Sequence, residues 1–146
     1  MQDDEISPAA PPLDWAARLL AFWFDAHGFD DWYGGGPDFD AAVEGLAGEW
    51  REALRVLPAE SFLTDPDTAL AAVILFDQVP RNIHRRQAEA FATDDLARAI
   101  ARGVVARGWD REIPEARRQF VYLPFEHSED IGDQRESLRL MAGLAD

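Results

Sequence analysis

Two short stretches of the sequence gather most of the polar side chains that could do chemistry. The first follows an apolar run at 69–76, and its members are Asp77, Gln78, Arg81, Asn82, His84, Arg85 and Arg86. The second contains Glu126, His127, Ser128, Glu129, Asp130, Asp133 and Gln134. A guanidinium beside amide groups can hold a carboxylate or phosphate through parallel hydrogen bonds. A histidine beside a carboxylate can act as a general base.

The two stretches allow a structural and a functional interpretation. In the structural one, the arginines cap helix ends and pair with the acids of the second stretch, as charges in structural networks often do. In the functional one, both stretches line one polar groove that binds a ligand. The predicted ligand-binding residues are then Asp77, Gln78, Arg81, Asn82, His127, Ser128, Glu129, Asp133 and Gln134.

Catalysis in such a groove would most plausibly be hydrolytic. His127 would be the base, and either Glu129 or Asp77 would orient its ring. Ser128 is a poor nucleophile candidate because it directly follows His127 and lacks a G-x-S-x-G elbow, and it is better explained as a helix N-cap. A divalent metal held by His127, Glu129 and Asp133 is disfavoured, because an H-x-E spacing on a helix points the two side chains nearly opposite ways. We predict no metal site and no cofactor.

Helix signals place both stretches at helix ends. Asp65 and Pro66 start a helix that contains the apolar run, and Pro80 should end or bend it near Gln78. Pro114 starts a shorter helix that Pro124 interrupts. A last helix is predicted over about 128–144, with its apolar stripe at Ile131, Leu138, Met141, Ala142 and Ala145.

The remaining segments also read as helices. Pro12 starts one that runs to about 25, and 39–57 is clearly amphipathic, with Arg51 among the charged residues assigned mostly to its other faces. Thr93 is predicted to cap a helix that Gly108 closes. The segment 30–38, DDWYGGGPD, reads as a loop, with the two acids at 38 and 40 near the start of the next helix. Since no stretch alternates like a strand, we predict an all-α fold of stacked antiparallel helix pairs.

Composition limits the function classes. The 146 residues contain no cysteine and no lysine, which excludes thiolate chemistry, disulfides and Schiff-base or P-loop lysines. A net charge of −14 opposes binding to nucleic acid or an anionic membrane. Residues 1–12 are acidic and proline-rich without a signal-peptide pattern, so we expect a disordered tail before one domain at 13–146 in a cytoplasmic protein.

Several of these strings resemble a known family. FDQVPRNIHR at 76–85, AFATD at 90–94 and VYLPFEHSEDIGDQ at 121–134 are similar to the bacterial family called domain of unknown function 924. LLAFWF at 19–24 and DWYGGGPDFD at 31–40 match the same family in order. The resemblance implies an all-helical, tetratricopeptide-like fold. It also places the family's signature residues at Asp77, Gln78, Pro80, Arg81, Asn82, Leu123, Pro124, His127, Ser128, Glu129, Asp133 and Gln134.

The resemblance also implies a further helical segment in many relatives, beyond the point where this sequence stops. We therefore expect an exposed apolar patch and a homo-oligomer. The leading functional hypothesis is a binding module that holds a peptide, a protein partner or a small anionic ligand in the groove. The alternative is a hydrolase that uses His127 and a carboxylate, with or without a divalent metal.

Overall fold

The computed structural model describes residues 10–144, and this part of the chain is helical without a strand. The all-α prediction is therefore confirmed. Residues 1–9 of the predicted tail at 1–12 lie outside the described residues. The α-helices are α1 (Trp15–Leu20), α2 (Phe29–Gly34), α3 (Gly36–Leu54), α4 (Pro66–Val73), α5 (Val79–Ile83), α6 (Asp94–Ala106), α7 (Glu115–Glu126) and α8 (Ile131–Ala142). Two π-helical turns, η2 (Ala21–Asp25) and η4 (Ile74–Gln78), and three 3₁₀ turns, η3 (Ala59–Phe62), η5 (Ala88–Phe91) and η6 (Trp109–Glu112), connect or extend them.

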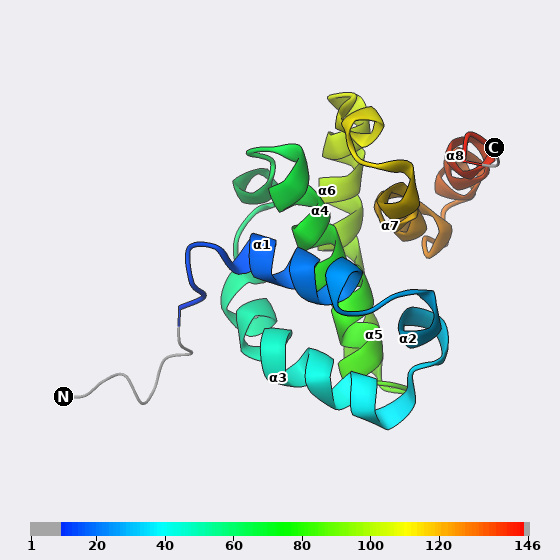
Figure 1. The fold of residues 1–146 in the computed structure, drawn as a ribbon. Coiled ribbons are helices and arrows are strands. Elements are labelled where there is room, and N and C mark those ends of the chain that lie inside the picture. The colour runs from blue at the N-terminus through cyan, green and yellow to red at the C-terminus, as the bar shows by residue number, and fades with distance from the viewer. Residues whose placement is uncertain (1–9, 145–146) are drawn as a thin grey trace.

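The apolar run predicted from the sequence forms the centre of the core. Every residue from Ala69 to Pro80 is buried, and α1, α6 and α7 all contact α4 (Figure 1). The start of this helix is as predicted: Asp65 accepts the backbone N–H of Thr68, and Pro66 occupies the first turn. A helix that is apolar on all sides must be covered on all sides, so its neighbours are arranged around it.

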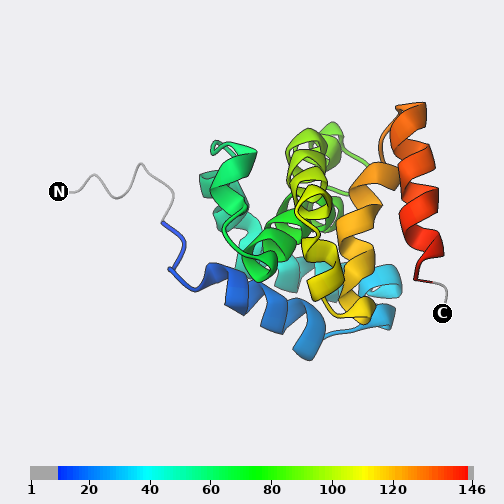
Figure 2. The same ribbon diagram turned by 90° about the horizontal axis from the view of Figure 1, so that it is seen from above.

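The last two helices form an antiparallel pair at one edge of the molecule. Figure 2 shows α8 running back along α7 after a short turn, and the two helices are in contact. The tetratricopeptide-like arrangement of the pairs stays a prediction.

The prediction of a loop at 30–38 is wrong, because α2 and the start of α3 occupy this segment. Trp32 stacks on Trp23 with the two ring centroids 6.3 Å apart, and it donates its indole N–H to the Trp23 carbonyl. These contacts anchor α2 to the core. Two glycines allow the direct junction with α3. A Cβ at Gly35 would lie 2.5 Å from a backbone oxygen, and Gly36 has φ +77°.

The prolines interrupt the helices less than predicted. Helix α7 continues through Pro124 to Glu126. At Pro80 the helix does not stop at Gln78. The π-helical turn η4 carries it into α5, with the Val79 N–H bonded five residues back to the Ile74 carbonyl. Such a turn widens the helix by one residue and is one way to absorb a residue that cannot donate.

Helix α8 differs from its prediction at its start and on its apolar face. Asp130, not Ser128, is the N-cap and accepts the backbone N–H of Asp133. Ile131 and Leu138, two members of the predicted stripe, are 65% and 72% exposed, whereas Leu140 is buried. The helix packs mainly on α7, so only a narrow face of it is covered.

Candidate functional site

The two polar stretches meet at Asp77. Asp77 lies in η4, and His127 follows the end of α7. The His127 Nδ1 atom is 2.9 Å from Asp77 Oδ1, and Arg81 Nη1 lies 3.3 Å from the same oxygen. We call Asp77, Gln78, Arg81, Asp94 and His127 the Asp77 cluster.

The Asp77 carboxylate is fully buried and bonded at both oxygens. Oδ1 faces His127 and Arg81, while Oδ2 accepts the side-chain N–H of Gln78 at 2.9 Å. An ionised carboxylate only accepts hydrogen bonds, so His127 donates through Nδ1. The lone pair of a neutral His127 ring is then on Nε2, and the side chain is 24% exposed. Asp77 thus orients the imidazole as a general base or a hydrogen-bond acceptor.

Arg81 is held by two carboxylates. Its Nη1 and Nη2 atoms donate to the two oxygens of Asp94 at 2.8 and 3.0 Å, a bidentate pair. Nη1 also donates to the Asp77 backbone carbonyl at 2.6 Å. The guanidinium carbon lies 5.3 Å from the ring centroid of Phe91, whose side chain is 57% exposed. The charge of Arg81 is therefore compensated within the protein.

Pro80 explains why these particular donors surround η4. Proline has no N–H, so the carbonyl of Phe76, four residues earlier, lacks its usual helical partner. The hydroxyl of Thr93 donates to that carbonyl at 2.7 Å. Thr93 was predicted to cap α6, but its side chain makes no cap hydrogen bond and serves the Phe76 carbonyl instead.

Arg51 supports Thr93 from the side of α3. It was assigned to a polar face but is only 1% exposed. Its Nε and Nη2 atoms donate to the Thr93 hydroxyl at 3.3 and 3.2 Å, and Nη2 lies 3.1 Å from a carboxylate oxygen of Glu89. Burial, together with the nearby charge of Arg55, lowers the pKa of Arg51 below its ordinary value. Buried arginines need such partners, because an unpaired buried charge is very costly.

Asp94, a member of the cluster, was not predicted as a site residue. Neither were Arg51 and Thr93, which support the cluster from outside. The available signal was Pro80, because a proline inside a buried helix requires a donor from elsewhere for the carbonyl it leaves free. The sequence does not say which residue supplies that donor, since Thr93 is 17 residues further along the chain.

Other predicted site residues lie outside the cluster. Asn82 donates to Asp40 at 2.9 Å, and Asp40 also pairs with Arg85. Glu129 is exposed and makes no side-chain hydrogen bond among residues 10–144, so Asp77 is the carboxylate that orients His127.

The remaining predicted residues organise the start of α8. Ser128 donates to Asp133 at 2.8 Å, and Asp133 pairs with Arg102 at 3.0 Å. Burial alone would raise the pKa of Asp133, but the hydrogen bonds from Ser128 and Arg102 hold it below its ordinary value. Gln134 donates to the backbone carbonyls of Glu126 and Ser128. These contacts are those of a helix terminus, and the Ser128 hydroxyl is not directed to His127.

Metal-binding and membrane-spanning features are not found in the described part of the chain. Residues 10–144 contain no group of three or more histidine or acidic side chains placed to hold a metal ion. None of the helices in this range has the length and apolar character needed to cross a bilayer.

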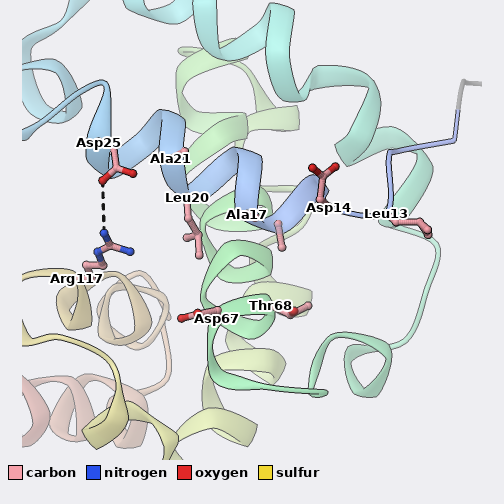
Figure 3. Close-up of a pocket in the computed structure, with 10 residues that line it drawn as sticks. Leu13, Asp14, Ala17, Leu20, Ala21, Asp25, Asp67, Thr68 and Arg117 are labelled. Carbon is pink, nitrogen blue, oxygen red and sulfur yellow. Dashed lines mark ion pairs between the residues drawn. The ribbon is translucent and has the colours of Figure 1, made fainter.

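A separate cavity of about 360 Å³ lies beside α1 (Figure 3). Its walls come from α1, the first turn of α4 and Arg117 of α7, which lies 3.7 Å from Asp25. None of the residues in the Asp77 cluster lines it.

Comparison with known proteins places the chain in a family. The model of a family described as bacterial protein of unknown function, DUF924, matches residues 19–146. The chain belongs to this family. This match confirms the resemblance to DUF924 that the sequence motifs indicated. No curated protein matches this chain.

A solved structure supports the same assignment. The protein of unknown function ATU0120 from Agrobacterium tumefaciens is 35% identical to this DUF924 chain, with a TM-score of 0.85. The match covers 90% of this chain and 74% of that chain. The shared fold extends over most of the DUF924 chain described above.

Proposed function

We propose that this protein is a binding module whose Asp77 cluster recognises a peptide or a segment of a protein partner. The observation that carries the proposal is the fixed His127 ring, oriented by a fully buried carboxylate and still partly exposed. Burying a charge with three polar partners costs desolvation free energy, and such buried polar networks are typical of a functional or highly ordered site.

The charge balance favours a ligand that donates hydrogen bonds. Arg81 is already paired with Asp77 and Asp94. Its positive charge is therefore compensated and attracts an anion only weakly. The small anionic ligand predicted from the sequence is therefore the least favoured occupant of this cluster. A backbone amide, an amine or a basic side chain would match the His127 acceptor and the net charge of −14.

Exposed aromatic rings flank the cluster. Phe91 lies over Arg81, and Tyr33 is 49% exposed. Burial, followed by the negative charges of Glu126 and Asp77, raises the pKa of Tyr33. Aromatic residues around a small polar centre are typical of peptide and protein interfaces.

Selection from a library of random short peptides displayed on phage tests the proposal. We expect the wild-type protein to enrich one shared sequence pattern, and His127→Ala and Phe91→Ala to bind those peptides at least about tenfold more weakly. His84→Ala is the matched control, because it removes a second partly exposed histidine outside the cluster. The proposal fails if no pattern is enriched, or if His127→Ala binds the selected peptides as well as wild type does.

The hydrolase alternative rests on the same pair of residues. A neutral histidine held by a buried aspartate is the arrangement of a general base. The nucleophile would then be water, since the Ser128 hydroxyl is bonded to Asp133. A panel of chromogenic esters, phosphate esters and amides tests it. A hydrolase would lose about a hundredfold in rate with His127→Gln and almost nothing with His84→Gln.

We also propose that the protein forms a homo-oligomer through α8. Ile131 and Leu138 are seven residues apart, so they share one helix face, and both are largely exposed. Light scattering should give a mass above 16.4 kDa for wild type and a lower mass for the Ile131→Ser, Leu138→Ser double variant. Val56→Ser is the control, since Val56 is exposed but lies outside α8. A monomeric wild-type protein would refute the proposal.

A further inference from the structure

A second polar hollow lies at the opposite end of α7 from His127. It has a volume of about 410 Å³ and is enclosed by η6, α7 and α8. Arg111 comes from η6, Arg118 from α7 and Arg139 from α8, and all three line it. We call it the Asp110 cavity, after the buried aspartate at its wall. None of the residues predicted from the sequence to form a site lies here.

The arginines of this cavity are less compensated than Arg81 is. Within residues 10–144, Arg111 and Arg118 form no ion pair, and Arg118 donates instead to the neutral carbonyl of Ile113 at 3.3 and 3.0 Å. Only Arg139 has an acidic partner, Glu136, at 2.6 Å. Three positive side chains stand against two carboxylates, Asp110 in the wall and Glu136 on Arg139, so an excess of positive charge remains on a protein whose net charge is −14.

Asp110, the carboxylate that lines the cavity, is already engaged. Tyr122 is buried and donates its hydroxyl to Asp110 Oδ2 at 2.7 Å. This contact holds both side chains in place, and burial with the hydrogen bond to Asp110 raises the pKa of Tyr122, so the phenol stays protonated. Asp110 is therefore used in building the wall, which leaves the guanidinium groups as the main charged ligands of the cavity.

We propose that the Asp110 cavity binds a small anion with at least two negative charges, carried by phosphate or carboxylate groups. Guanidinium groups donate parallel hydrogen bonds to either group, and arginines from three separate elements would converge on one polyanion. Leu140 and Leu144 add apolar surface for a short carbon skeleton. The volume suits a small metabolite. This site is separate from the Asp77 cluster, so the two proposals stand or fall independently.

Isothermal titration calorimetry on the full chain at low salt tests this inference, with inorganic pyrophosphate in one arm and citrate in the other. We expect saturable binding in at least one arm, which identifies the anionic group. The double variant Arg111→Gln, Arg139→Gln should weaken anion binding by at least about tenfold, since hydrogen bonds to charged groups are among the strongest single contacts. His127→Ala should leave it unchanged.

The control variant removes the same charge elsewhere. Arg86 and Arg135 are exposed and form no ion pair within the described residues, and neither lines the cavity. The double variant Arg86→Gln, Arg135→Gln should bind the anion with an affinity within about twofold of the wild-type affinity. The inference is overturned if neither anion binds below about 10 mM, or if the control weakens binding as much as the cavity variant does.

Discussion

The Asp77 cluster and the Asp110 cavity combine the same residue types in different proportions. In the cluster, one arginine faces two carboxylates, Asp77 and Asp94. In the cavity, three arginines face Asp110, whose Oδ2 atom is taken by Tyr122, and Glu136, which pairs with Arg139 alone. The comparison teaches that arginine does not by itself indicate an anion site. Whether an arginine can bind an anion depends on whether the fold already pairs it with a carboxylate.

The two regions also differ in how deeply their charges lie. Asp77 is central to the core, and its bonds to Arg81, Gln78 and His127 are the condition for burying it. The arginines at 111 and 139 lie at the surface, where water solvates them. We therefore expect substitutions in the cluster to lower stability and substitutions in the cavity to affect mainly binding.

The largest effect is expected for Asp77→Ala. It removes the buried acceptor shared by Gln78, Arg81 and His127, of which only Arg81 keeps a second carboxylate, Asp94. Breaking such a buried pair costs about 3–5 kcal/mol in the free energy of unfolding. Asp110→Ala, which removes one hydrogen bond to Tyr122, should cost about 1–2 kcal/mol. Urea unfolding followed by tryptophan fluorescence measures both. Equal losses would show that the two aspartates are equally important and would break the comparison.

Thr93→Val should have the next largest effect. It removes the donor to the Phe76 carbonyl and the acceptor for the buried Arg51, so we expect a loss of about 2–3 kcal/mol. Thr68→Val is the control, since the Thr68 hydroxyl bonds to Asp65 at an exposed site and its loss should cost about 0.5 kcal/mol.

A second substitution sharpens the same test. Pro80→Ala restores an N–H four residues after Phe76, so it should recover part of the stability lost in Thr93→Val. In a double-mutant cycle, purely additive effects would contradict the role assigned to Thr93.

The pH dependence of the Asp110 cavity is the third prediction. Burial, followed by the hydrogen bond to Asp110, raises the pKa of Tyr122 above its ordinary value of 10.0. The folded protein then keeps a proton that the unfolded chain releases, so the contribution of Tyr122 is complete below pH 10.0 and falls as the pH rises above it. The slope is at most about 1.4 kcal/mol per pH unit.

Tyr122→Phe isolates this contribution. At neutral pH it should be about 1 kcal/mol less stable than wild type, because a hydrogen bond to a buried carboxylate is lost. Above about pH 10 the two free energies of unfolding should approach each other, since only wild type loses the Tyr122 proton on unfolding. Curves that stay parallel to about pH 11 would contradict the buried, protonated phenol.

The sequence predicted the local features of this structure better than its long-range contacts. Asp65 and Pro66 mark the start of α4 correctly, because an N-cap acts within one turn. The contact between Asp77 and His127 agrees with one of the two interpretations that the sequence left open, in which both stretches lie together. These signals depend on neighbouring residues, or on the need of an apolar run to be buried.

The errors concern residues whose partners are distant in the chain. Arg51 reads as a surface charge on an amphipathic helix, and its burial depends on distant partners, Glu89 and Thr93, the latter 42 residues later. Asn82 has the composition of a site residue but bonds to Asp40, again 42 residues away. The Asp110 cavity was missed because its arginines are scattered over 111–139 and form no motif. Helix packing alone brings them together.

The smallest effect on stability is expected for Arg111→Gln. Arg111 is exposed and forms no ion pair within residues 10–144, so the free energy of unfolding should change by no more than about 0.5 kcal/mol. Arg81→Gln removes the bidentate bond to Asp94 and the contact with buried Asp77, and should cost about 2–3 kcal/mol. If pyrophosphate then raises the melting temperature of Arg81→Gln as much as that of wild type, but raises that of Arg111→Gln less, the anion site and the structural arginine are separated. The reverse pattern would assign the anion to Arg81 and remove the distinction between the two regions.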